Sequence, residues 1–162
     1  MSFHSRTSFG QSKRTIETKL ARACGDKSPK GFLDEPIADL VDFINGHPEY
    51  VTTSSCSGRI VLFATFEKKW ILAKHGLVTP EETLTILSQY FDNSPGISPV
   101  LLKHEPFILH VQCIDLKAAE RLLQMVLQAG YRESGIVLGK KKIMVGVRTF
   151  SGTMEIPLNA AS

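Results

Sequence analysis

Short apolar runs separated by tight turns are the feature of this sequence that most restricts its fold. The runs at 59–66 and 70–75 are joined by Glu67-Lys68-Lys69, which is typical of a hairpin. Hairpins connect antiparallel strands, whereas a purely parallel sheet needs crossovers of roughly a dozen residues or more. We therefore expect a mixed, largely antiparallel sheet, with further strands predicted at 100–103, 106–113, 136–138, 143–148 and 154–156.

Helical patterns alternate with these strands. Apolar residues recur at helical spacing around Ile16, over 37–44 after Asp34, which is predicted to be an N-cap, and over 84–91. The run Thr79-Pro80-Glu81-Glu82 is typical of a helix start, because Thr caps the backbone and Glu three residues later completes a capping box.

A last helix is predicted between Asp115 and Gly130. A length of 162 residues suits one domain. We expect a compact single α+β domain over 12–162, with helices flanking the sheet, and a flexible N-terminal tail over 1–11.

Composition and absent motifs exclude several classes of protein. No apolar run approaches the roughly 20 residues that span a bilayer. The net charge of +3 permits a polyanionic partner without requiring one. Three cysteines without a CxxC pair favour a reducing compartment, and we expect the cytoplasm. The sequence has no P-loop, no dinucleotide-binding glycine motif and no HExxH, and we expect no metal site.

The first candidate site is the hydroxyl-rich segment at 52–59, predicted to be a loop. Its backbone N–H groups and small side chains suit a carboxylate or phosphate, Gly58 permits close approach or a positive φ, and Arg59 supplies a forked cation. The alternative is a polar turn whose hydroxyls bond their own backbone. Cys56 is either a nucleophile or a small buried side chain.

The second candidate site lies on the strand at 106–113. His110 and Gln112 are predicted to share one face, where they can contact a base edge or move a proton near neutral pH. The alternative is a hydrogen-bonded histidine at a sheet margin. Arg132, Ser134 and Arg148 lie near strand ends, where functional groups gather, although an Arg–Glu pair beside a turn is often a surface ion pair.

Several segments in fixed order carry a family resemblance that runs from about residue 12 to residue 158. They are Ser-Pro-Lys-Gly-Phe-Leu-Asp-Glu-Pro-Ile at 28–37, Thr-Thr-Ser-Ser-Cys-Ser-Gly-Arg-Ile at 52–60, Glu-Pro-Phe at 105–107 with His-Val-Gln-Cys at 110–113, Gly-Tyr-Arg-Glu-Ser-Gly-Ile at 130–136, Val-Arg at 147–148 and Glu-Ile-Pro-Leu at 155–158. Together they resemble the wybutosine-synthesis methyltransferase family, the third enzyme of that tRNA pathway.

The resemblance implies an enzyme that uses S-adenosylmethionine to methylate N4 of 4-demethylwyosine, a base next to the anticodon of phenylalanine tRNA. It also implies an α+β fold unlike the Rossmann-type, doubly wound methyltransferases. Family members usually continue into a further C-terminal helical segment, and we expect this chain to lack it, because its sequence stops at Ser162.

Chemistry then suggests a role for each candidate residue. The donor carboxylate, or a tRNA phosphate, is placed against the cofactor-binding set Ser54, Ser55, Cys56, Ser57, Gly58 and Arg59. His110 is the candidate base, and the substrate-binding set is Tyr50, Gln112, Arg132, Ser134 and Arg148, with Tyr50 stacking on the tricyclic base. Two rival hypotheses stay open: a non-catalytic tRNA- or RNA-binding module of the same fold, and a small-molecule hydrolase that uses Cys56.

Overall fold

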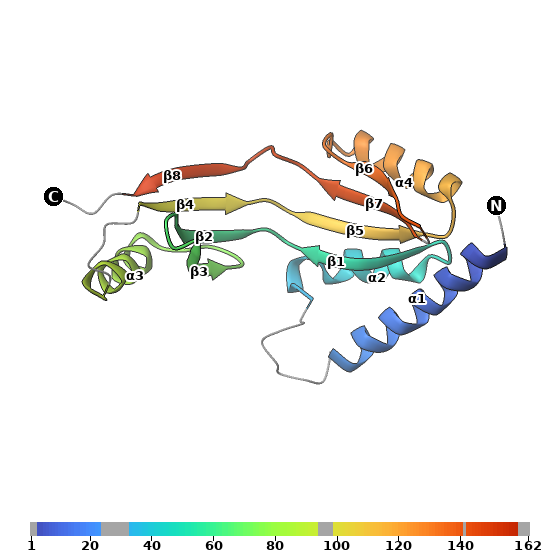
Figure 1. The fold of residues 1–162 in the computed structure, drawn as a ribbon, viewed down its shortest axis with the longest axis horizontal. Coiled ribbons are helices and arrows are strands. Elements are labelled where there is room, and N and C mark those ends of the chain that lie inside the picture. Colours follow the sequence, from blue (N-terminus) through green and yellow to red (C-terminus); the bar gives the residue numbers. More distant parts are fainter. Residues whose placement is uncertain (1–2, 24–32, 94–98, 141, 159–162) are drawn as a thin grey trace. The chain divides into compact units, whose positions relative to one another are not determined.

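The chain folds into two compact units, each built around its own four-stranded sheet (Figure 1). A computed structural model describes residues 3–23, 33–93, 99–140 and 142–158. Unit 1 comprises Met1–Ser57 and Phe107–Thr149, and unit 2 comprises Gly58–Pro106 and Phe150–Ser162.

Unit 1 has the strand order β1-β5-β7-β6, and every pair of neighbouring strands is antiparallel. Helices α2 and α4 supply Val41 and Leu122 to a core that also contains Leu109, Val111 and Val145 from the sheet. The elements of unit 1 are α1 (Phe3–Ala23), the 3-10 helix η1 (Glu35–Ile37), α2 (Ala38–Gly46), β1 (Tyr50–Cys56), β5 (Ile108–Cys113), α4 (Leu116–Gln128), β6 (Gly135–Leu138) and β7 (Ile143–Arg148).

Unit 2 has the strand order β3-β2-β4-β8, again antiparallel throughout. Its core is built from Leu62, Leu87 and Val100. The capping box predicted for α3 is confirmed, since the Glu82 N–H donates to Thr79 Oγ1 at 3.2 Å. The elements of unit 2 are β2 (Arg59–Ala64), β3 (Lys69–Lys74), α3 (Pro80–Asn93), β4 (Val100–Glu105) and β8 (Met154–Leu158).

The predicted α+β class is confirmed, with differences in detail. The described strands form two antiparallel sheets, where one mixed sheet was predicted, and the contacts divide the predicted single domain into two units. Residues 3–11, expected to be a flexible tail, lie within α1. The hydroxyl-rich segment is a strand as far as Cys56, because its residues pair with β5, so the loop prediction was wrong there.

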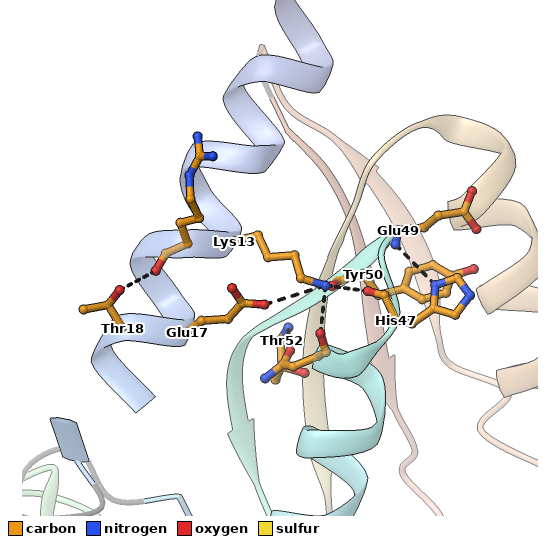
Figure 2. A network of polar contacts seen from close by, with 9 residues as sticks. Lys13, Glu17, Thr18, His47, Glu49, Tyr50 and Thr52 are labelled. Atoms are coloured by element: carbon orange, nitrogen blue, oxygen red, sulfur yellow. Dashed lines mark hydrogen bonds and ion pairs between the residues drawn. The ribbon is translucent and has the colours of Figure 1, made fainter. Parts of the chain in front are cut away.

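Lys13 joins α1 to the end of α2 and the start of β1 (Figure 2). Its ammonium donates to the carbonyl oxygens of Asn45 at 2.7 Å and Tyr50 at 3.0 Å, and also to that of His47. These acceptors include the last carbonyls of α2, where a cation also complements the helix dipole. Burial lowers the pKa of Lys13, and the nearby Glu17 carboxylate partly opposes that shift.

We expect Lys13→Met to lower the free energy of unfolding of unit 1 by about 1–2 kcal/mol, because three carbonyls lose a charged donor. Arg14→Met removes the same charge from an exposed position of the same helix and is the matched control. Urea denaturation with amide exchange along α1 measures the effect. Equal losses in the two variants would contradict this role for Lys13.

Candidate functional site

The face of the unit 1 sheet that points away from its core carries His110. On β5, Leu109, Val111 and Cys113 are buried in the core of unit 1, and His110 alternates with them. The predicted alternation of this strand is therefore confirmed. His110 is half-buried, and the imidazole lies against β7, since a Cβ built on Gly146 would come within 3.6 Å of His110 Cδ2.

A β-bulge in β1 places Ser54 on the same face as His110. Tyr50 and Thr52 pair with Cys113 and Val111, so simple alternation would put Ser54 on the core face as well. The register shifts between Thr52 and Ser54, and Ser54 then pairs with His110. An extra residue in one strand re-aims the side chains that follow it, and such bulges are common beside active sites.

Ser54 and His110 form a hydrogen-bonded pair. Ser54 Oγ lies 2.9 Å from His110 Nδ1, and the hydroxyl of the bulged residue Thr53 donates to the His110 carbonyl at 3.1 Å. With Nδ1 directed toward β1, Nε2 lies on the side of β7, where no described residue is found hydrogen-bonded to it. The pair therefore fixes the ring and leaves one nitrogen for an incoming group.

Arg148 and Ser134 also lie together on this sheet. Arg148 pairs with Ile108, two residues from His110 along β5, and its Nε donates to the Glu133 carbonyl at 3.1 Å. The Arg148 N–H donates to Ser134 Oγ at 3.1 Å, which holds the end of β7 against the turn before β6. Arg132 is exposed in that turn. The structure thus brings Arg148 and Ser134 together, near the end of the strand that pairs with His110.

Two predicted substrate-binding residues are buried. Gln112 is 1% exposed and lies on the His110 face, and its Oε1 has no hydrogen-bond partner among the described residues. Tyr50 is 6% exposed in the core of unit 1, where its hydroxyl donates to the Ala118 carbonyl at 3.0 Å and its ring stacks on His47. The face of the Tyr50 ring is thus occupied within the protein.

The groups predicted to bind an anion already have carboxylate partners. The Ser57 N–H donates to Asp34 Oδ2 at 2.7 Å, which also explains why Asp34 makes no side-chain cap to the following helix. In unit 2, the Arg59 guanidinium pairs with Glu105 and lies 4.3 Å from the centre of the Trp70 ring. An anion must therefore displace a carboxylate from each group.

The remaining residues of the segment differ in exposure. Ser55 and Cys56 are half-buried, and Gly58 has a positive φ of 98°, one of the two roles predicted for it. The assignment of this segment to the methyl donor stays a prediction.

Cys113 is the thiol that the structure makes inert. Burial raises its pKa to about 12, and the carboxylates of Asp115 and Glu49 add to the shift. Because the thiolate is the reactive form, we expect Cys113 to resist iodoacetamide in the folded protein at about pH 8 and to react after denaturation. Peptide mass spectrometry measures the modification, with the half-buried Cys56 as the internal comparison. Equal rates of alkylation for folded and unfolded Cys113 would contradict the burial.

Sequence reasoning missed the groups that hold His110 in place. Thr53 makes the bulge, and Gly146 lies beside the imidazole on β7, where an added Cβ would be in ordinary contact with the ring. The sequence contained one usable signal, since a glycine inside a strand often marks a bulge or a close approach.

The fold and this site define an α+β protein with a half-buried histidine on the sheet face opposite the core, and comparison with known proteins identifies its family. The family model "Methyltransferase TYW3" matches residues 11–162. A relative from Xenopus laevis, "tRNA wybutosine-synthesizing protein 3 homolog", is 41% identical over 82% of this chain and 54% of its own length. "tRNA wybutosine-synthesizing protein 3" from Schizosaccharomyces pombe is 37% identical over 93% of this chain and 68% of its own length. The chain belongs to the methyltransferase TYW3 family, and it spans about half the length of the Xenopus laevis relative.

Solved structures share the fold. The PH1069 protein from Pyrococcus horikoshii superposes with a TM-score of 0.80 at 27% identity and covers 97% of this chain and 79% of its own. A hypothetical protein from Aeropyrum pernix has a TM-score of 0.66 at 24% identity, with 78% and 74% covered, and supports the fold alone. No helix among the described residues is long and apolar enough to span a membrane.

We expect Ser54→Ala to change the imidazole ¹⁵N signals of His110, because Nδ1 loses its partner. Ser55→Ala removes a hydroxyl from the next residue, which pairs with Leu109, and is expected to leave those signals in place. NMR of histidine-labelled protein measures both. Unchanged His110 signals in Ser54→Ala would show that the pair does not form in solution.

Proposed function

We propose that this chain is a tRNA methyltransferase of wybutosine synthesis. The observation that carries the proposal is the family match over residues 11–162, together with relatives named as wybutosine-synthesizing proteins. The structure adds a half-buried histidine on the sheet face opposite the core, with one ring nitrogen held by Ser54 and the other facing β7. Proton removal near neutral pH is a task that histidine performs well.

The finer proposal is that the donor is S-adenosylmethionine and that the acceptor is N4 of 4-demethylwyosine in phenylalanine tRNA. In the transfer, the bond between the methyl carbon and sulfur breaks, its electron pair goes to sulfur, and a bond forms between nitrogen and the methyl carbon. The proton of the accepting nitrogen goes to His110 Nε2 and then to water. Because the displacement is in line, the main contribution of the protein is to position the two reactants.

The residues around His110 have supporting roles in this proposal. The proposal requires the tautomer in which Nδ1–H donates a hydrogen bond to Ser54 Oγ, which lies 2.9 Å away, so that the Nε2 lone pair is directed toward β7 and the substrate. Arg148 is exposed, with Nε held by the Glu133 carbonyl, so its remaining guanidinium N–H groups can contact a tRNA phosphate. We place the reaction in the cytoplasm, on the basis of three cysteines without a CxxC pair.

We expect His110→Gln to reduce the rate of methyl transfer by about 10²-fold or more, with tRNA affinity retained, because general base catalysis contributes roughly 10²–10⁴. The assay follows labelled methyl transfer from S-adenosylmethionine to phenylalanine tRNA that carries the demethyl base. His104→Gln is the matched control, since that imidazole is bound to the Gly152 carbonyl in unit 2.

Two results would contradict the proposal in different ways. Salt-sensitive tRNA binding without any heat of binding for S-adenosylmethionine would favour the non-catalytic RNA-binding module. Full transfer activity in His110→Gln would remove His110 from the role of base while leaving the methyltransferase proposal intact.

A further inference from the structure

A groove lies between α2 and α4 on the surface of unit 1. Both helices pack on the sheet face that carries Leu109 and Val111, so the groove lies on the side of the sheet opposite to His110. Its volume is about 460 Å³, which is within the usual range of binding sites. We call it the α2–α4 groove, and neither His110, Ser54 nor Arg148 is among the residues that line it.

The α2–α4 groove exposes large apolar side chains. Phe43 of α2 is 80% exposed and Met125 of α4 is 54% exposed. Ile44, Leu122 and Tyr50, which are half-buried or buried, complete the apolar part of the lining. Single apolar residues are common on protein surfaces, whereas a contiguous patch marks an interaction site. Methionine and phenylalanine gathered between two helices are typical of a groove that holds the apolar face of a third helix.

One end of the groove holds a carboxylate that is already paired. Glu49 supplies the only carboxylate among the lining residues, and its Oε2 lies 2.6 Å from Arg121 Nη2. The Glu49 N–H donates to His47 Nδ1 at 3.2 Å, so the proton of that ring is on Nε2. The His47 ring itself stacks on Tyr50 (Figure 2). This end of the groove therefore presents N–H donors and no unpaired carboxylate among the described residues.

Helix α4 adds further donors along the groove. Arg121, Gln124 and Gln128 are three and four residues apart, so they follow one face of the helix over about 10 Å, or two turns. The side chains of Gln124 and Gln128 have no hydrogen-bond partner among the described residues. The exposed Lys117 precedes Arg121 by one turn on the same face. Carboxylates, which are acceptors with negative charge, complement this row of cations and amide N–H groups.

An RNA also carries anionic acceptors, but the groove suits a protein helix better. Unstacked bases lie on flat aromatic faces, and the Tyr50 ring is already covered by His47, which leaves Phe43 as the exposed aromatic ring of the lining. Phosphate binding relies on clustered cations, whereas Arg121 is paired with a carboxylate and Lys117 adds a single charge. The aliphatic and thioether side chains of the lining match apolar side chains of a protein.

We propose that the α2–α4 groove is a docking site for an acidic amphipathic helix of a protein partner. The apolar face of that helix covers Phe43 and Met125, and its carboxylates bind the donors of α4. A contact over two helical turns is a small interface, so we expect transient binding with a Kd of about 10–100 μM. The inference is independent of the proposed methyl transfer, because the groove lies on the side of the sheet opposite to His110.

The test uses the full chain and two fluorescent helical peptides of about 16 residues, which make four to five turns. Both peptides have leucine at alternating third and fourth positions, and the flanking positions are glutamate in one and lysine in the other. Fluorescence anisotropy should show that the glutamate peptide binds and that Phe43→Ser weakens it about tenfold or more. Leu84→Ser, on α3 of unit 2, changes a residue that is 64% exposed and is the matched control.

Charge reversal tests the role of α4 separately. The exposed double variant Gln124→Glu with Gln128→Glu should weaken the glutamate peptide about tenfold and strengthen the lysine peptide, because its carboxylates repel one and attract the other. Two exposed glutamates on a helix leave the core of unit 1 unchanged, and thermal unfolding checks that the variant is folded.

Several results would overturn the inference. They are equal affinity of wild type and Phe43→Ser for the glutamate peptide, equal affinity of wild type for the two peptides, and no binding of the glutamate peptide at about 1 mM. Single-stranded RNA that binds more tightly than the glutamate peptide, and is lost in Phe43→Ser, would assign the groove to RNA. Dimers of wild type that are absent in Phe43→Ser would assign it to a second copy of this chain.

Discussion

The pairing of β5 with β1 on one side and β7 on the other is the constraint on which unit 1 depends. Burial of Leu109, Val111 and Cys113 in the core fixes which face of β5 points inward. A slip of one residue would bury His110 and expose those three side chains. The same hydrophobic contacts that stabilise the sheet therefore hold the histidine on the opposite face, so the position of the candidate site follows from the packing of the core.

Local signals in the sequence predicted much of this arrangement. Alternation along 108–113 identified the face of His110, and the Thr79 and Asp115 caps were confirmed because capping depends only on neighbouring residues. The bulge at Thr53 could not be predicted, since it arises from the register between β1 and β5 and not from the local sequence. The loop predicted at 52–59 was wrong up to Cys56 for the same reason: strand pairing decided the structure of residues that locally favour turns.

Contacts with residues far away in the sequence explain why the surroundings of Arg59 and Tyr50 could not be predicted. Arg59 was expected to face an anion, and its guanidinium pairs with Glu105, which is 46 residues away and opposite it on β4. Tyr50 was expected to stack on a base, and its hydroxyl bonds a carbonyl of α4. Both contacts depend on how strands and helices assemble. His110 and Ser54 differ from these residues because their bond occupies only Nδ1, and Nε2 has no hydrogen-bond partner among the described residues.

Selective ¹⁵N labelling of histidine gives the most direct test that the His110 face of unit 1 is the functional site. His47 and His104 serve as internal references, because their Nδ1 atoms are bound to the Glu49 N–H and the Gly152 carbonyl. On titration with an anticodon stem-loop that carries the demethyl base, the His110 signals should move while those of His47 and His104 stay in place. Movement of either reference histidine with an unchanged His110 would contradict the account.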